Sequence, residues 1–212
     1  ALGIRRQDIH LVILSHEHFD HIGAAAFFTG AAVIGAHRLA ANKIELQDEF
    51  VTMNKYFNVA NRQFRVDLWL EDGCLIDVGN YKLEVIHTPG HTSGCICLYE
   101  PDHRFLFSGD TVFANGTLSE VAASGSISDY VSSLQRLSSL HISELYPAHG
   151  KTSLAPEEEM KRALEYARSV LSDSKLLFEA LAKREAKATR EERLLKRPWS
   201  GMSRPDNGPP KR

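Results

Sequence analysis

A cluster of metal-ligand residues directly after a short apolar run constrains this chain more than any other feature. Residues 9–14 are β-branched, aromatic or aliphatic, which predicts a buried strand, and they lead into the sequence SHEHFDH at positions 15–21. In an extended backbone, residues two apart project to the same side. His16 and His18 are therefore expected to reach one metal ion together.

The same cluster predicts a second ligand group. Where the chain turns after His18, Asp20 and His21 point elsewhere and can reach another ion. Imidazole mixed with carboxylate favours zinc, iron or manganese over calcium or magnesium. The alternative is a polar loop of solvated histidines, but three histidines and an aspartate within six residues at a strand end rarely arise that way.

Three later segments have the same form, in which an apolar strand ends in a tight turn that presents one ligand-type residue. His91 follows a Pro-Gly turn, Asp110 follows the run at 105–107, and His149 follows the run at 145–146. Each alone is more typical of an ordinary loop. Together with the first cluster, they place seven ligand-type side chains at strand ends, where α/β proteins build their sites. The seven are His16, His18, Asp20, His21, His91, Asp110 and His149.

Short strands and helices alternate along the first 150 residues, which favours a layered α/β architecture. From about residue 156 to 195 the apolar side chains recur at helical spacing, after a proline and three glutamates that suit a helix N-terminus. The expected strands are 9–14, 33–36, 81–86, 94–99, 105–107 and 145–146, and the expected helices are 24–28, 129–140 and 156–195.

In their order along the chain and in their residues, the four motifs resemble those of the metallo-β-lactamase superfamily, and most of all those of its glyoxalase II-like branch. They are His-x-His-x-Asp-His at 16–21, Thr-Pro-Gly-His-Thr at 88–92, Ser-Gly-Asp-Thr at 108–111 and Pro-Ala-His-Gly at 147–150. The resemblance implies a four-layer αββα sandwich with a dinuclear site at one edge of its two sheets. β-Lactamases of this superfamily typically carry Cys or Ser where Asp110 stands, so the carboxylate favours the other branch.

The resemblance also assigns roles. His16, His18 and His91 would hold the first metal, and Asp110 would bridge it to a second. Two divalent ions are implied, with zinc expected and iron or manganese as alternatives, and Asp20 would orient a metal-bound hydroxide and accept its proton. The substrate-binding residues are not indicated. The second metal would be held by Asp20, His21 and His149.

Two departures from the family bear on the domain organisation. Only fifteen residues precede the first histidine of the cluster, so we expect an N-terminally truncated copy that lacks strands of its first sheet. The helical segment is shorter than the domain with which glyoxalase II holds glutathione. We predict a metallo-β-lactamase-like domain over 1–155, partial at its N-terminus, a C-terminal helical segment over 156–197 and a disordered basic tail over 198–212.

Composition narrows the function classes. The 212 residues carry 25 Lys and Arg against 27 Asp and Glu, a net charge of −2 that argues against a general polyanion-binding protein. Residues 183–212 have a local net charge of +6, but they include a single aromatic residue, Trp199, and so lack the series of interleaved aromatic residues that stacks bases. Three cysteines are too few for a disulfide scaffold and suit a reducing compartment, so a cytoplasmic protein without membrane association is expected.

The leading functional hypothesis is a metal-dependent hydrolase of a small ester, thioester or lactone, similar to hydroxyacylglutathione hydrolase or to a lactonase. A mononuclear iron sulfur (persulfide) dioxygenase is an alternative, because relatives with that activity keep the same motifs. A nucleic-acid phosphodiesterase would use the basic tail, although a small-molecule substrate is favoured over nucleic acid. An inactive, truncated binding module is the fourth hypothesis.

Overall fold

The computed structural model describes residues 3–60, 62–115 and 117–195. The chain forms two compact units, Ala1–Leu171 and Ser172–Arg212. The first unit contains both β-sheets and every residue of the predicted site, and the second begins within the long C-terminal helix.

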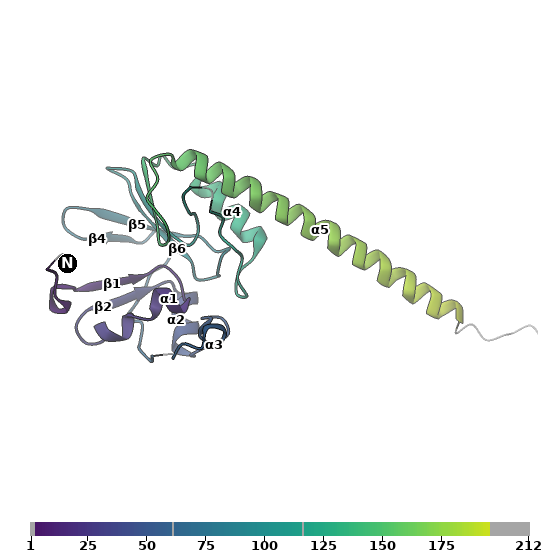
Figure 1. Ribbon diagram of the computed structural model, residues 1–212, viewed down its shortest axis with the longest axis horizontal. Coiled ribbons are helices and arrows are strands. Elements are labelled where there is room, and N and C mark those ends of the chain that lie inside the picture. The colour runs from purple at the N-terminus through teal and green to yellow at the C-terminus, as the bar shows by residue number, and fades with distance from the viewer. Residues whose placement is uncertain (1–2, 61, 116, 196–212) are drawn as a thin grey trace, which may run out of the picture. The chain divides into compact units, whose positions relative to one another are not determined.

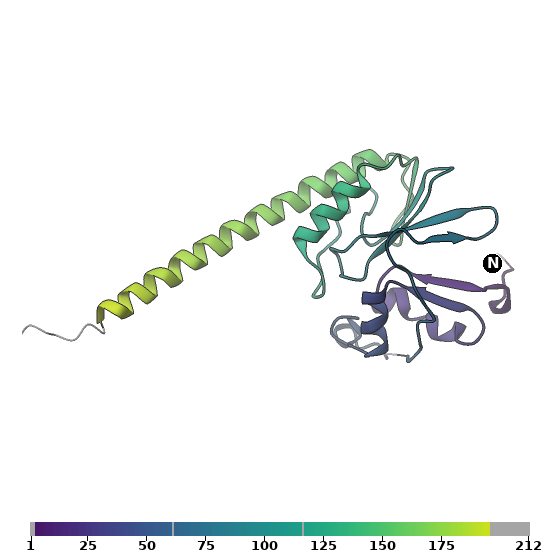
Figure 2. The same ribbon diagram turned by 180° about the vertical axis from the view of Figure 1, so that it is seen from behind.

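The first sheet has three parallel strands in the order β1-β2-β3. Apolar residues on the outer face of this sheet pack against short helices, which Figures 1 and 2 show on the side of β1 and β2 away from the second sheet. Parallel neighbours require crossover connections, and these helices provide them. The strands are β1 (Leu11–Leu14), β2 (Val33–Ala36) and β3 (Leu68–Trp69), and the helices are α1 (Phe19–Ile22), α2 (Arg38–Glu45), α3 (Asn54–Phe57) and the 3-10 helices η1 (Arg6–Asp8) and η2 (Ala25–Phe28).

The second sheet has five strands in the order β4-β5-β6-β7-β8. Its pairs are antiparallel except β7 with β8, which run parallel because the connection between them contains helix α4 (Ile127–Leu137). The strands are β4 (Leu75–Asp77), β5 (Lys82–His87), β6 (Ile96–Glu100), β7 (Phe105–Gly109) and β8 (Glu144–Pro147).

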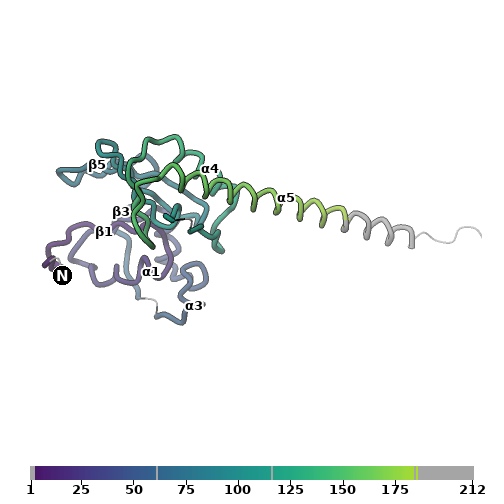
Figure 3. The backbone as a smooth tube through the Cα atoms, turned by 45° about the horizontal axis from the view of Figure 1, so that its top comes forward, coloured from purple at the N-terminus to yellow at the C-terminus, as the bar shows by residue number. Residues whose placement is uncertain are grey.

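Helix α4 and the first turns of α5 (Pro156–Leu195) cover the outer face of the second sheet. The Ser126 side chain caps α4 by accepting the N–H of Asp129, and α5 begins at the predicted proline with three glutamates in its first turn. Met160, Ala163 and Ala167 of α5 are buried in this cluster. Figure 3 also shows the start of α5 beside α4.

A third apolar cluster lies between the two sheets, and it unites Leu70, Val85 and Ile96 with partly buried neighbours from β1 and β4. With helices outside each sheet, the first unit is a four-layer αββα sandwich, and the predicted fold class is confirmed.

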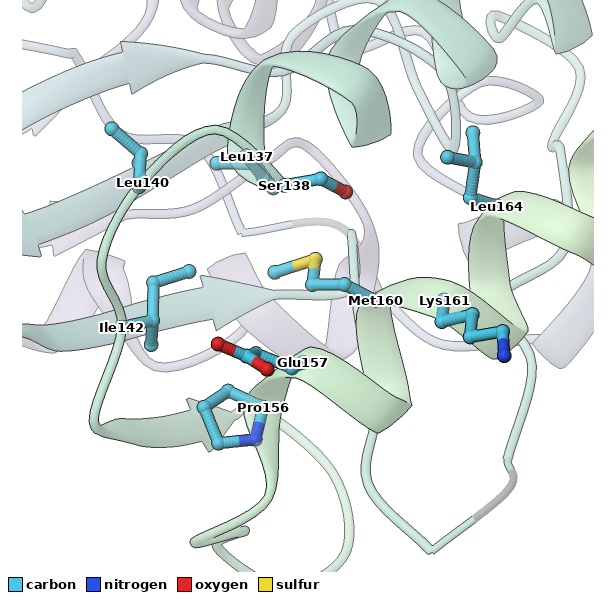
Figure 4. A pocket seen from close by; sticks show the side chains of 9 residues that line it. All are labelled: Leu137, Ser138, Leu140, Ile142, Pro156, Glu157, Met160, Lys161 and Leu164. Atoms are coloured by element: carbon cyan, nitrogen blue, oxygen red, sulfur yellow. The ribbon is translucent and has the colours of Figure 1, made fainter.

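A cavity of about 280 Å³ remains where α4 ends and α5 begins. Figure 4 shows its lining, in which Leu140 and Ile142 from the loop after α4 and Met160 from α5 lie near polar residues such as Glu157.

The strands and helices predicted from sequence are present, with ends shifted by one to three residues in most cases. The segment expected to be helical at 24–28 is a 3-10 helix, and α2, α3, β3 and β4 were not predicted. The division into a domain over 1–155 and a helical segment over 156–197 stays a prediction. Residues 196–212, which include the predicted disordered tail, lie outside the described residues. No helix among the described residues combines the length and apolar character needed to cross a membrane.

Candidate metal centre

The first predicted ligand group converges at the ends of β1 and β5. The Nδ1 atom of His18 lies 3.0 Å from His16 Nε2 and 3.0 Å from His91 Nε2. All three side chains are nearly inaccessible to solvent. Three ring nitrogens this close, offered as one set, suit a single cation, since imidazole nitrogens bind zinc at about 2.0–2.1 Å.

The second group lies beside the first and is more open to solvent. His149 Nε2 is 3.1 Å from Asp20 Oδ2 and 3.2 Å from His21 Nε2. His21 Nε2 is in turn 3.5 Å from Asp20 Oδ2. Asp20, His21 and His149 thus offer one oxygen and two nitrogen atoms that could hold a second ion, although His21 and His149 are 128 positions apart in the sequence.

Asp110 lies between the two groups. Its Oδ2 atom is 3.7 Å from His91 Nε2 and 3.7 Å from His149 Nε2, and its Oδ1 atom is 3.4 Å from His21 Nε2. A carboxylate with one group on either side can bind to both ions and partly neutralise them. All seven predicted ligand residues are therefore brought together, and their binding of metal stays a prediction.

Two glycines set the turns that present these ligands. A Cβ added to Gly90 would lie 2.5 Å from Cα of Tyr130, so only glycine lets the turn before His91 pack on α4. Gly109 has a φ of +52°, a left-handed conformation that side chains with a Cβ disfavour. This bend at the end of β7 directs the chain, so that Asp110 leaves the sheet toward the histidines.

Hydrogen bonds on the far side of the rings orient the ligand nitrogens. Ser15 Oγ lies 3.2 Å from His16 Nδ1 and 3.4 Å from His21 Nδ1, which leaves both Nε2 atoms directed at the cluster. His91 Nδ1 is 2.5 Å from the carbonyl oxygen of Glu120, a contact that requires Nδ1 to donate and leaves Nε2 unprotonated. The hydroxyl of Thr111, the residue after Asp110, lies 3.0 Å from the Thr88 hydroxyl rather than against a ligand.

Electrostatics favours a cation at this place. Burial lowers the pKa of His16 far below its usual value, and burial together with His91 lowers the pKa of His18 to about 4. The pKa of Asp110 lies below its usual range, because the contact with His21 and the neighbouring histidines outweigh the effect of burial. Neutral imidazoles beside an ionised carboxylate are the forms that bind metal. Among the described residues, His18 Nε2 and Asp110 Oδ1 are buried without a hydrogen-bond partner.

Glu17 is a site residue that sequence reasoning missed. It stands between two ligands, its side chain is fully buried, and its carboxylate accepts hydrogen bonds from Lys43 at 2.7 Å, Thr92 at 2.9 Å and Ser124 at 3.0 Å. This carboxylate thus joins the first ligand loop to the loop that carries His91. Only the polar residue type between the two histidines hinted at it, since its partners are far away in the sequence.

A cleft of about 490 Å³ opens onto both ligand groups. Its lining includes four ligand residues and four residues of the segment 50–57: His18, Asp20, His91, Asp110, Phe50, Met53, Tyr56 and Phe57. The cleft therefore gives a small molecule access to the place where metal ions would be bound.

The family model of the metallo-beta-lactamase superfamily matches residues 1–149, about 70% of the chain. The chain belongs to the metallo-β-lactamase superfamily. Members bind divalent metal ions with the residue types that converge here, and the resemblance inferred from the four motifs is thereby confirmed.

Curated relatives within this superfamily include thioester hydrolases. Human acyl-coenzyme A thioesterase MBLAC2 is 35% identical over 161 residues, which cover 67% of this chain and 56% of that protein. Hydroxyacylglutathione hydrolase of Francisella tularensis subsp. novicida is 27% identical over 166 residues, covering 78% of this chain and 56% of the enzyme. The chain thus spans a little over half the length of these two relatives.

Solved structures of the superfamily share the fold. The metallo-beta-lactamase family protein TTHA1429 of Thermus thermophilus superposes with a TM-score of 0.65 at 23% identity, covering 81% of this chain and 65% of that one. TTHA1623, solved in a di-iron-bound form, superposes with a TM-score of 0.58 at 27% identity, covering 70% of this chain and 73% of that one.

The His103, His141 and His10 side chains lie outside the ligand groups of this metallo-β-lactamase domain, as their place outside the motifs indicates. His87 is also outside them and stacks on His37, with ring centroids 3.8 Å apart. Cys95 and Cys97 are both buried as free thiols in the core, and burial raises the pKa of the Cys97 thiol to about 11.

His37 gives this domain a predicted acid sensitivity away from the metal ligands. Its Nδ1 atom accepts the N–H of Leu39 at the start of α2, which requires a neutral ring, and burial and the stacked His87 lower its pKa to about 4. A histidine in an unfolded chain has a pKa near 6.5, so between about pH 6.5 and 4 the unfolded chain binds a proton at His37 that the folded chain does not bind. The contribution of neutral His37 to the free energy of unfolding is therefore present in full above about pH 6.5 and is lost as the pH falls toward 4.

The free energy of unfolding is expected to decrease between pH 7 and 4.5, and we expect His37→Asn to make this decrease smaller by about 1–2 kcal/mol. The reason is that asparagine can still cap the helix but does not titrate. Urea unfolding of both proteins at several pH values, with equal metal content, measures it. A His141→Asn variant is the control, since His141 is exposed and lies outside the ligand groups. Parallel pH curves for the wild type and His37→Asn would contradict the prediction.

Proposed function

We propose that this chain is a dinuclear metal-dependent hydrolase that acts on acyl thioesters. The position of the Asp110 carboxylate between two separate ligand groups carries the proposal, because it is the arrangement that a bridged pair of ions requires. The buried Oδ1 atom of Asp110, which has no hydrogen-bond partner among the described residues, also fits such a pair.

The proposed roles follow from the ligand groups. His16, His18 and His91 would hold one ion. Two such ions, when bound, lower the pKa of a shared water and polarise a carbonyl oxygen. Zinc is the proposed metal, with iron or manganese as alternatives. Asp20, His21 and His149 would hold the other ion, and Asp110 would bind to both.

The chain's own residues supply the remaining chemistry. Asp20 is partly exposed to the cleft, so its carboxylate can accept a proton from the attacking water. No side-chain nucleophile is required. The thioester assignment is supported by the two relatives named above, an acyl-coenzyme A thioesterase and a hydroxyacylglutathione hydrolase. An uncharged ester or lactone would present the same carbonyl group.

Metal and activity measurements test this proposal. The protein is loaded separately with zinc, iron and manganese, its metal content is determined, and an acyl-coenzyme A, S-lactoylglutathione, a lactone and a phosphodiester are assayed. We expect two ions per chain and thioester turnover. One iron per chain with oxygen uptake would indicate the dioxygenase instead, and turnover of the phosphodiester alone would indicate nucleic-acid processing.

A ligand variant checks that activity comes from this site. We expect His91→Ala to lower metal content by about one ion per chain and to abolish measurable thioester turnover, because only two imidazoles of the first group remain. His141→Ala is the matched control, as His141 lies outside the ligand groups. Full activity of His91→Ala with undiminished metal would contradict the assignment.

A further inference from the structure

The segment 50–57 exposes large apolar side chains directly beside the ligand residues. Phe50, Tyr56 and Phe57 are 59%, 67% and 57% exposed. Single exposed apolar residues are ordinary in soluble proteins, but a contiguous group indicates a binding surface. The ring centroids of Phe50 and Tyr56 are 6.2 Å apart. The ring centroids of Phe57 and of Phe19, which belongs to the first ligand loop, are 4.8 Å apart.

Buried polar groups hold this segment in place. Thr52 is fully buried and its hydroxyl donates to the carbonyl of Asp48, whose carboxylate accepts the N–H groups of Phe50 and Val51. The carbonyl of Thr52 accepts the N–H of Phe19, which connects the segment to the first ligand loop. The polar side chains therefore face inward and the aromatic ones outward, the reverse of ordinary packing.

Backbone strain at both ends of α3 indicates that this reversal has a function. Met53 and Asn58 have φ values of +64° and +51°, and neither is glycine. Met53 has a side chain that rarely adopts this left-handed conformation, which costs about 1–3 kcal/mol and is found mainly at ligand-binding sites. Here the strain turns the helix so that its aromatic residues line the cleft.

The cleft beside these residues lacks a partner for an anionic substrate group. Of the described residues that line it, none is Lys or Arg, whereas Asp20, Asp110 and Glu120 are acidic. Apolar side chains line the cleft together with the ligand residues, and the cleft has a volume of about 490 Å³. An uncharged apolar group fits this lining better than a carboxylate or phosphate does.

We infer that Phe50, Met53, Tyr56 and Phe57, called the acyl shelf below, bind the acyl chain of the substrate. The inference rests on the proposed function and adds the substrate class: thioesters with an apolar acyl chain of medium length. The carbonyl group lies at the ligand residues, and the chain extends from it over the shelf. The thiol portion of the substrate leaves on the other side of the cleft.

A chain-length series tests the shelf. Each buried methylene contributes about 0.8 kcal/mol, a factor of about four, and half-exposed rings give less. With zinc-loaded protein, we expect kcat/KM for the octanoyl thioester of N-acetylcysteamine to exceed that for the butyryl thioester by at least tenfold. Tyr56→Ser and Phe50→Ser are expected to reduce this ratio severalfold. Leu75→Ser, which removes an equally exposed apolar residue from β4, is expected to leave the ratio unchanged.

A binding measurement separates this inference from the proposed function. Octanamide, which has no charge, is titrated into metal-free protein by calorimetry, and acetamide is the comparison. We expect octanamide to bind and Tyr56→Ser to weaken it by about fivefold or more. Binding without turnover of any thioester would refute the proposed function and leave the shelf intact. Turnover without dependence on chain length, or octanamide binding equal in Tyr56→Ser and wild type, would overturn the shelf.

Discussion

Replacement of Asp20 by asparagine is expected to lower thioester turnover by a factor of about 10²–10⁴ while the metal content stays near that of the wild type. The amide keeps one oxygen in the place of the carboxylate Oδ2, which lies 3.1 Å from His149 Nε2, but it cannot accept a proton. Of the two carboxylates among the seven residues, the Asp20 side chain is 37% exposed and the Asp110 side chain 9%. Asp20 is thus the carboxylate that water entering the cleft meets first.

The pH dependence gives a readout that a ligand role alone would not change. If Asp20 accepts the proton, the wild type has a limb in its pH profile of kcat that Asp20→Asn loses. Asp110→Asn is the comparison, because Asp110 lies between both ligand groups and its replacement should lower metal content as well as turnover. Parallel losses of metal and activity in Asp20→Asn would leave that residue a ligand role only.

The convergence of the ligand residues could be predicted from sequence because it depends on local features repeated four times. A buried strand that ends in a turn and presents His or Asp is readable at each of the motifs. The αββα order of layers then follows from the resemblance that these motifs carry. The Asp110 carboxylate was expected as the bridge, and the structure places it between both groups.

The parts that sequence reasoning missed depend on contacts between distant residues. Helix α3 has four residues and begins and ends with left-handed backbone at Met53 and Asn58, which no periodic pattern indicates. Strand β3 has only two residues, too few for an alternating pattern. Helix α2 is capped by a histidine, an uncommon N-cap residue, so its start had no recognised signal.

Glu17 illustrates the same limit at the site itself. Its type and position look like a variable residue between two ligands, but its three partners lie 26, 75 and 107 positions away in the sequence. Because Glu17 is buried, its carboxylate links distant segments of the fold instead of contacting solvent. Its carboxylate has no side exposed to water, and Lys43 supplies the charge that compensates it.

Replacement of Lys43 by methionine is therefore expected to lower the free energy of unfolding by about 3–5 kcal/mol, because it leaves a buried carboxylate without a cation. Methionine keeps most of the length and the apolar stem of the lysine side chain, so little packing is lost. The hydroxyl groups of Thr92 and Ser124 remain as donors, but neither carries charge. Urea unfolding at pH 7 with fixed metal content measures the change.

Helix α2 supplies a matched control. Arg38 forms an ion pair with Glu71 at 2.9 Å, but both side chains are about half exposed, whereas Lys43 is 19% and Glu17 0% exposed. Arg38→Met should therefore cost no more than about 1 kcal/mol. The contrast between two cation–carboxylate pairs on one helix isolates burial from charge pairing as such.

The double variant Glu17→Gln/Lys43→Met tests the cause. If the penalty comes from an unpaired buried charge, glutamine removes that charge and restores part of the stability lost in Lys43→Met. Because Glu17 stands between His16 and His18, Lys43→Met should also weaken zinc binding, and the double variant should recover part of that loss. A double variant less stable than Lys43→Met would show instead that the carboxylate itself, through Thr92 and Ser124, holds the two ligand loops together.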